Sequence, residues 1–355
     1  MFLALKEMRY SKLRYSLIVG IMFLIGLVVF LLSGLADGLS QEFRQTVDDW
    51  NAKEIVLSDD ANNILAASQL KLEDVKDISS NEKAPLSLYS GAIGKKDNKV
   101  NISLFGTNDD AFFLPSVTSG KSFKKDNEVI ISQNLADKGF KINDTITVGS
   151  NDLKVKVVGI VPSTSYIATP VMYSNIKTAT EIKFGEDMVK TTDNYPINAV
   201  LSNDSNTTLS NDSLTKLSTQ KFIDNLPGYT EQSLTLDSMI YVLFVIASAV
   251  IGIFMYVITL QKTAIFGVMK VQGINSWFIS KSILAQSFLV GVFGVILSGV
   301  ATYFLSLVLP EAMPFAINIT QWCIYGIILV IVSTIGGLFS IVTVNKVDPI
   351  NAIGG

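Results

Sequence analysis

The sequence predicts a membrane protein with four transmembrane α-helices and a large extracellular α+β domain inserted between the first and second helices. The chain of 355 residues is 49% hydrophobic and only 17% charged, which is apolar for a soluble protein of this size. The apolar residues are concentrated in charge-free runs, each long enough to form the roughly 20-residue helix that crosses a hydrocarbon core of ~30 Å. The predicted spans are residues 15–36, 238–260, 282–309 and 320–344.

Basic residues beside these spans predict the orientation of the chain. They are Lys6, Arg9, Lys12, Arg14, Lys262, Lys270, Lys281 and Lys346. The short loop 310–319, between the last two spans, contains no lysine or arginine. By the positive-inside rule, the N-terminal amphipathic segment 1–14, the segment 261–281 and the tail 345–355 are cytosolic. Residues 37–236 then form the extracellular domain.

The extracellular domain is expected to be rich in strands. Runs with alternating or β-branched residues between turn signals are "KEIVLS", "VNISLFGT", "NEVIISQ", "DTITVGS" and "LKVKVVGIVP". The stretch "SQNLADKGF" predicts a short helix that ends at Gly139, whereas residues 208–229 fit either a helix or a mobile segment. We expect two halves, one before and one after residue ~120.

Several classes of function are disfavoured by the composition. The chain has no histidine, so we expect no histidine-based catalysis and no histidine metal site. The lone Cys323 cannot form an internal disulfide. "SGKS" at residues 119–122 lacks the first glycine of a phosphate-binding loop, because Pro115 stands at that position. We therefore predict no catalytic or metal site, no cofactor and no nucleic-acid partner.

The segment "LQKTAIFGVMKVQGINSWFI", between the second and third spans, is longer and more apolar than a simple turn requires. As a helix, it would place Ile265, Val268 and Met269 on one face, with Phe266 and Lys270 forming a second stripe. One interpretation is a helix on the membrane surface whose lysines reach the aqueous phase. The other is a docking helix that fits a groove on a cytosolic partner.

Three stretches resemble those of the MacB/FtsX-like permeases of ABC transporters. "FGVMKVQG" resembles the family's coupling-helix motif, "VNKVDPINAI" resembles its shared ending, and residues 127–162 resemble the core of its outer domain. The resemblance implies that the segment 261–274 receives the movement of a separate cytosolic ABC ATPase. The residues that it assigns to this coupling are Lys262, Ile265, Phe266, Gly267, Met269, Lys270 and Gly273. Many members have Glu where this chain has Ile265, so the usual polar contact with the ATPase is in question at that position.

Within this family, four stretches, two of which overlap those above, are most similar to the HrtB-type heme-efflux permeases of Gram-positive bacteria. They are "FLLSGLADGL", "QKTAIFGVMKVQGI", "DNLPGYTEQSLTLDSMI" and "VDPINAIGG". The resemblance implies a multi-pass permease subunit in the cell membrane that exports heme from the membrane or its outer leaflet. ATP hydrolysis is expected in the partner ATPase and not in this chain. The alternatives are an FtsX-like signal transducer, or efflux of a peptide, a lipoprotein or a macrolide.

Two consequences of this resemblance concern particular residues. The family's dimeric state implies a second copy of the chain. We expect the two copies to meet through their first and second spans, with the small residues Gly26, Ser33 and Gly34 supporting that contact. Without histidine, heme iron would be held by other ligands near the outer ends of the first two spans. The candidate heme-binding residues are Tyr229, Met239, Glu42, Phe43 and Tyr241.

Overall fold

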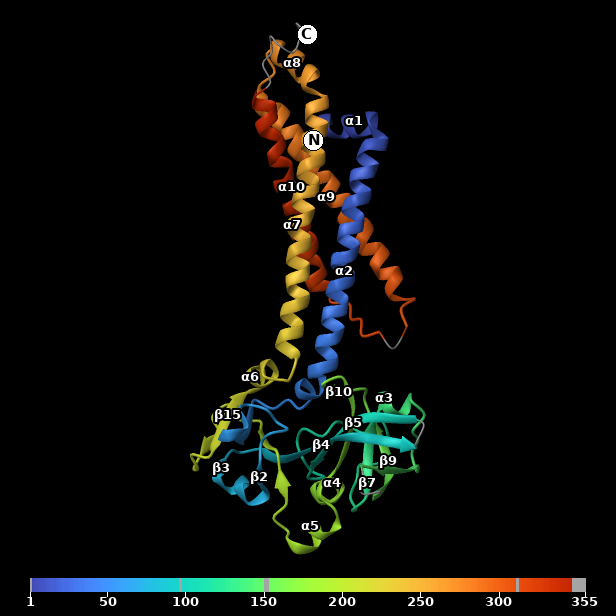
Figure 1. The fold of residues 1–355 in the computed structure, drawn as a ribbon, viewed down its shortest axis with the longest axis vertical. Coiled ribbons are helices and arrows are strands. Elements are labelled where there is room, and N and C mark those ends of the chain that lie inside the picture. The colour runs from blue at the N-terminus through green and yellow to red at the C-terminus, as the bar shows by residue number, and fades with distance from the viewer. Residues whose placement is uncertain (1, 96–97, 150–152, 311–312, 347–355) are drawn as a thin grey trace. The chain divides into compact units, whose positions relative to one another are not determined.

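The computed structural model describes residues 2–95, 98–149, 153–310 and 313–346 (Figure 1). It divides into a helical unit, Met1–Gly38 with Ser233–Gly355, and an outer unit, Leu39–Gln232. The expected fold class is confirmed, because apolar helices flank an inserted domain of strands and short helices. The cytosolic tail predicted at 345–355 lies almost entirely outside the described residues.

The outer unit is built on a mixed sheet, which has 11 strands within the described residues. The strands of this unit are β1 (Glu54–Ser58), β2 (Leu70–Lys71), β3 (Ile78–Ser79), β4 (Lys83–Lys95), β5 (Asn98–Thr107), β6 (Ser119–Gly120), β7 (Glu128–Ser132), β8 (Thr145–Val148), β9 (Leu153–Val161), β10 (Ser165–Tyr166), β11 (Thr169–Asn175), β12 (Pro196–Ile197), β13 (Ala199–Ser202), β14 (Thr208–Leu209) and β15 (Leu214–Ser218). Its short helices are two 3₁₀ helices (Asp59–Ala61 and Leu72–Asp77), α3 (Gln133–Ala136), α4 (Ile176–Phe184), α5 (Glu186–Thr191) and α6 (Thr219–Asp224). Each of the predicted β-type runs contains a strand, and the predicted short helix is α3.

The expected division at residue ~120 is wrong. Strand β1 pairs antiparallel with both β13 and β15, and β5 pairs in parallel with β11. Early and late parts of the domain therefore share one sheet. The long hairpin β4–β5, which is in register from Ser87↔Gly106 to Lys95↔Asn98, links the two ends of that sheet. Local patterns predict strands well, but they do not show which distant strand each one pairs with.

The core of the outer unit includes the end of α2 (Lys12–Asp49), a long helix whose last residues belong to this unit. Trp50, which follows that helix, is fully buried. Its ring lies 5.5 Å from the ring of Phe105 on β5 and 6.2 Å from that of Phe222 on α6. Aromatic contacts of this kind add stability beyond the area that they bury. They pack the residue that follows the helix into the core of the outer unit.

The helical unit contains the predicted spans. Its helices are α1 (Phe2–Tyr10), α2 (Lys12–Asp49), α7 (Tyr229–Gln261), α8 (Thr263–Val271), α9 (Ser276–Ser306) and α10 (Ile319–Lys346). Among the described residues, α2, α7, α9 and α10 are long and apolar enough to cross a membrane. At 1.5 Å per residue, the 38 residues of α2 extend about 57 Å, well beyond a hydrocarbon core of ~30 Å. Helices α2 and α7 therefore continue out of the membrane without interruption.

The small residues of α2 pack within the chain. A side chain at Gly26 would collide with Ser298 of α9, and one at Gly34 would collide with the ring of Phe315. Ser33 is fully buried. The backbone N–H of Ala316 also donates to the carbonyl oxygen of Gly34, at 3.0 Å. The expectation that these small residues lie between two copies is therefore wrong, because α9 and the following loop already contact Gly26 and Gly34, and Ser33 is buried within the chain.

Candidate functional site

A groove of about 680 Å³ lies in the helical unit, between α2 and the outer part of α7. Its apolar lining includes Val28, Leu32, Leu234, Met239, Val242 and Leu243. The hydroxyl of Ser238, which also lines it, donates to the carbonyl oxygen of Leu234 at 2.6 Å and so is already bonded. The groove therefore suits a flat or elongated apolar ligand, and its volume falls within the ~300–1,000 Å³ of small-molecule sites.

Met239 is the candidate heme residue that the structure places in this groove. Tyr241 does not line it. Residues two positions apart on a helix point in different directions, so the two side chains cannot act on one face. The ring of Tyr241 lies 6.5 Å from that of Phe244, on the same helix. Within the groove, the thioether of Met239 is the soft metal ligand among its lining residues.

The other three candidates, Tyr229, Glu42 and Phe43, belong to the outer unit. The rings of Phe43 and Tyr229 lie 6.5 Å apart, so the outer ends of α2 and α7 are in contact there. The backbone N–H of Ala168 donates to the carbonyl oxygen of Glu42 at 2.9 Å, which attaches α2 to the turn between β10 and β11. The side chain of Glu42 is half-buried.

The hydroxyl of Tyr229 is engaged by neighbouring polar groups. It lies 3.1 Å from the hydroxyl of Ser40, and Nη1 of Arg44 donates to it at 3.4 Å. The guanidinium group of Arg44 also donates hydrogen bonds to both carboxylate oxygens of Asp48, at 2.7 and 2.8 Å. A two-pronged contact of this kind fixes the guanidinium group in place. Tyr229 consequently holds α7 against α2 where both helices meet the outer domain.

The predicted coupling segment forms a separate short helix, α8, whose ends are set by specific residues. Gly273 has a φ of 84°, in the left-handed region that favours glycine. The N–H of Ile274 bonds to the carbonyl of Met269, and that of Gly273 bonds to the carbonyl of Lys270, both at 3.0 Å. This pattern is a Schellman helix terminus. Asn275 then caps α9 by accepting from the N–H of Trp277. Gly273 therefore ends α8.

The faces of α8 divide clearly into buried and exposed residues. Phe266 is only 4% exposed and packs in the core of the helical unit, with Gly267 also buried and Met269 partly buried against that core. Ile265 is 57% exposed and Val268 is 43% exposed. Exposed apolar side chains on a short helix suit a partner's groove or the membrane surface. The buried residues attach α8 to the chain's own helices.

Lys262 lies inward, at the start of α8. Its ammonium group is 3.1 Å from a carboxylate oxygen of Glu7, and its side chain is only 12% exposed. The amide of Gln286, on α9, donates to the same carboxylate, and the hydroxyl of Tyr15, on α2, donates to Oε1 of Gln286 at 2.5 Å. This polar network, Glu7–Lys262–Gln286–Tyr15, joins α1, α2 and α9 to the base of α8.

Glu7 and Gln286 did not emerge from the sequence as functional candidates. Each carries a signal that could have identified it. Glu7 is the only acid in the segment 1–14, and Gln286 is one of few strongly polar residues in the span 282–309. Polar residues inside membrane helices find partners, because an unpaired polar group is costly there. The partners themselves depend on helix packing, which periodicity alone does not give.

Comparisons with known proteins cover both parts of this architecture. The MacB-like periplasmic core domain matches residues 16–216, and the FtsX-like permease C-terminal domain matches residues 238–349. A Staphylococcus haemolyticus protein described as "Putative hemin transport system permease protein HrtB" is 30% identical over 357 residues. The match covers 100% of this chain and 99% of that relative.

Two further relatives have the same full-length layout. A Staphylococcus epidermidis protein with the same description is 30% identical over 356 residues, with 100% of this chain and 99% of the relative covered. A protein of Mycobacterium tuberculosis described as an uncharacterized ABC transporter permease is 23% identical over 366 residues, with the same coverage. The similarity therefore extends through the spans, the outer domain and the coupling segment.

Proposed function

This chain belongs to the MacB/FtsX-like permeases of ABC transporters, and we propose that it exports heme from the membrane or its outer leaflet. One observation favours heme as the substrate. The staphylococcal relatives, similar over their whole length, are described as hemin transport permeases. The apolar groove between α2 and α7 supports this choice, because heme is a flat and largely apolar molecule that such a groove suits.

In this proposal, Met239 contacts the heme directly. Its thioether is a known type of axial ligand for heme iron, and it lies on the wall of the groove. Tyr229 acts differently, by joining the outer ends of α2 and α7 through Phe43, Ser40 and Arg44. Glu42, Phe43 and Tyr241 stay predicted contributors whose effect on heme binding is to be measured.

We further propose that a separate cytosolic ATPase drives export through α8. The exposed Ile265 and Val268 would contact that subunit, and the buried Phe266 would transmit its movement to the spans. Apolar contacts replace the polar contact that a glutamate at position 265 would make. The continuous helices α2 and α7 would carry the movement to the outer domain.

The functional unit in this proposal is a homodimer in the cell membrane of a Gram-positive bacterium. The small residues of α2 are occupied within the chain, so another face of the helices has to make the contact. Leu24 on α2 and Val245 and Ile253 on α7 are exposed apolar residues. They could pack against a second copy in the membrane.

The test of the substrate is the growth of a strain that lacks this chain. We expect increased sensitivity to heme, restored by the wild-type gene, with unchanged sensitivity to antimicrobial peptides and macrolides. Unchanged heme tolerance with increased sensitivity to macrolides or peptides would show that the permease exports one of these compounds and not heme. Unchanged tolerance to all three would favour a signalling role.

A further inference from the structure

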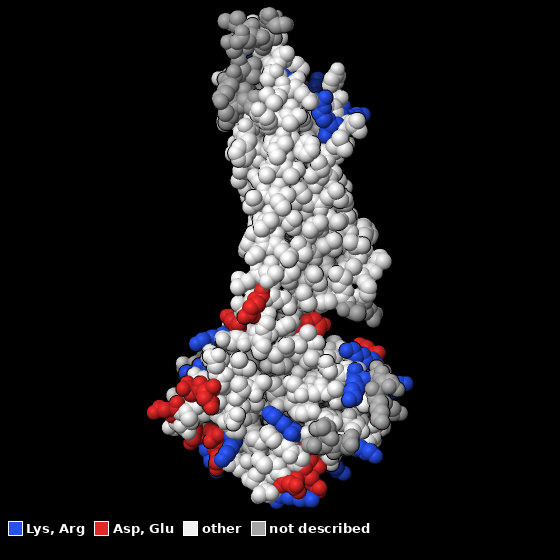
Figure 2. Space-filling view, viewed as in Figure 1, with Lys and Arg blue, Asp and Glu red and all other residues white. Residues whose placement is uncertain are grey.

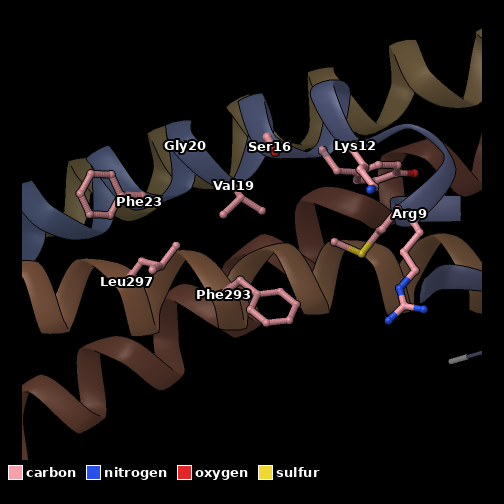
Figure 3. Close-up of a pocket in the computed structure, with 10 residues that line it drawn as sticks. Arg9, Lys12, Ser16, Val19, Gly20, Phe23, Phe293 and Leu297 are labelled. Carbon is pink, nitrogen blue, oxygen red and sulfur yellow. The ribbon is translucent and has the colours of Figure 1, made fainter. Parts of the chain in front are cut away.

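A second groove, of about 740 Å³, lies at the opposite end of the helical unit from Met239, between the start of α2 and α9 (Figure 3). It is distinct from the groove that holds Met239, because the two share no lining residue. Phe23 of α2 and Phe293 and Leu297 of α9 provide apolar walls. Gly20 leaves the wall open, since a side chain added there would meet no atom within 4 Å.

The charges of this groove lie at one end. Figure 3 shows Arg9 and Lys12 at the end of the groove that lies away from Phe23 and Leu297. The part of the helical unit that carries α1 also shows a cluster of basic side chains in Figure 2, whereas the surface along the spans is almost free of charge. The groove, cationic at one end and apolar along its length, is therefore complementary to an amphiphile with an anionic headgroup.

Within the described part of the chain, the two cations have no ionic partner and so can bind an external anion. The ion pairs among the described residues include neither Arg9 nor Lys12. Glu7, the one acid of the N-terminal segment, bonds instead to Lys262 and Gln286. Glu7 does not line the groove, and its carboxylate is taken up by Lys262 and Gln286.

The length of the groove matches one leaflet of a bilayer. From Lys12 to Phe23 the helix rises about 16 Å, at 1.5 Å per residue. Half of a hydrocarbon core of ~30 Å is about 15 Å. An acyl chain that follows α2 from Lys12 would therefore end near Phe23, at about the middle of the membrane.

We propose that this groove binds an acidic phospholipid of the cytosolic leaflet, with the headgroup phosphate on Arg9 and Lys12 and an acyl chain along Gly20, Phe23, Phe293 and Leu297. A phosphate accepts paired hydrogen bonds from a guanidinium group and a charge contact from an ammonium group. The bound lipid would pack α1 against the spans, next to the Glu7–Lys262 contact at the base of α8. The proposal is independent of which substrate the permease exports.

The experiment uses the full-length permease in bilayer nanodiscs that contain phosphatidylglycerol and phosphatidylcholine. Lipids retained after gentle release are counted by native mass spectrometry. We expect wild-type protein to retain phosphatidylglycerol preferentially. Lys12→Gln should weaken retention about fivefold, the value for one cation near a membrane surface, and adding Arg9→Gln should weaken it about 25-fold.

Two matched controls separate a built site from a general surface charge. Arg14→Gln removes a cation from the same helix, but Arg14 does not line the groove, so retention should be unchanged. Gly20→Leu should fill the groove and lower the retention of both lipids. Gly299→Leu, in another apolar groove lined by Phe30 and Trp322, should leave phosphatidylglycerol retention unchanged.

Thermal unfolding of each variant confirms that it is folded before its lipids are counted. Equal retention of the two phospholipids by the wild type would overturn the proposal. Equal losses in Lys12→Gln and Arg14→Gln would also overturn it, because they would show a diffuse charge effect. Full retention in Gly20→Leu, or displacement of phosphatidylglycerol by hemin at equal concentration, would rule out a lipid as the occupant.

Discussion

The ammonium group of Lys262 lies 3.1 Å from the carboxylate of Glu7, so the first helix of the chain contacts the base of α8. The amide of Gln286 completes the contact from α9. Both charged side chains are largely withdrawn from water, at 12% and 20% exposure. An ion pair in such a setting is costly to break from one side, because the remaining charge is left without a partner. This contact connects the base of α8 to α1 and α9.

Replacing Lys262 by Met should destabilise the helical unit by about 1–3 kcal/mol, since it leaves the carboxylate of Glu7 without its cation. Glu7→Gln should cost less than this, because an amide can still bond to Gln286. The double variant should be more stable than the sum of the single losses predicts, as measured by thermal unfolding in detergent. Strictly additive losses would show that the two residues do not interact.

Replacing Ile265 and Val268 together by Asp should abolish co-purification with the ATPase while the permease still inserts and folds. Both side chains are exposed, so the change should cost little stability. Tyr10→Asp is the control, because Tyr10 is 94% exposed on α1 and lies outside α8. Normal ATPase binding by the Ile265 and Val268 variant would mean that α8 is a membrane-surface helix.

Phe266→Asp should act by a different route from that double variant. Because Phe266 is buried, an aspartate there would place a charge in the core, at a cost of about 3 kcal/mol or more. We expect a lower unfolding temperature together with lost stimulation of the ATPase. Unchanged thermal stability would contradict the buried position of this side chain.

Replacing Met239 by Leu tests heme ligation at nearly constant volume. The change removes the sulfur, so heme affinity should fall about fivefold, equivalent to ~1 kcal/mol, and the absorbance spectrum of bound heme should shift. Tyr241→Phe keeps the aromatic ring and removes only a hydroxyl of a residue that does not line the groove, so it should change neither quantity. If the triple replacement of Tyr229, Glu42 and Met239 leaves the affinity and the spectrum as they are, heme binds elsewhere.

Cysteine cross-linking tests the dimer on a Cys323→Ser background, which removes the exposed native thiol. Cysteines at Leu24 or Val245 should form cross-links between copies in native membranes. Gly26→Cys should not, because Gly26 packs against Ser298 of its own chain. Efficient cross-linking at Gly26 with none at the exposed positions would reverse this assignment.

The spans, the strands and the short helix between the second and third spans could be predicted because each carries a local signal. Charge-free length identifies the spans, β-branched runs identify the strands, and Gly273 ends α8 where a helix terminus needs a left-handed residue. The role of the small residues could not be predicted in the same way. Gly26 and Gly34 indicate close packing, but whether the neighbour is Ser298, Phe315 or a second copy depends on the tertiary arrangement of the helices.

The site residues show the same limit. Met239 and Tyr241 are close in sequence, yet the helix turns them to different faces, and only Met239 lines the groove. The sequence pattern predicts that Lys262 is a surface cation, but its side chain is largely buried and pairs with Glu7, which is more than 250 positions earlier in the chain. Residue type predicted what each side chain can do. The packing of distant helices decided which partner it meets.

The most direct test of heme export is transport by the permease and its ATPase reconstituted together in proteoliposomes loaded with heme. The account predicts that heme leaves the membrane for an acceptor protein only when ATP is hydrolysed, and that both Met239→Leu and the Ile265 and Val268 double variant slow this transfer. Heme transfer at the same rate with and without ATP, in a complex that still hydrolyses ATP, would contradict it.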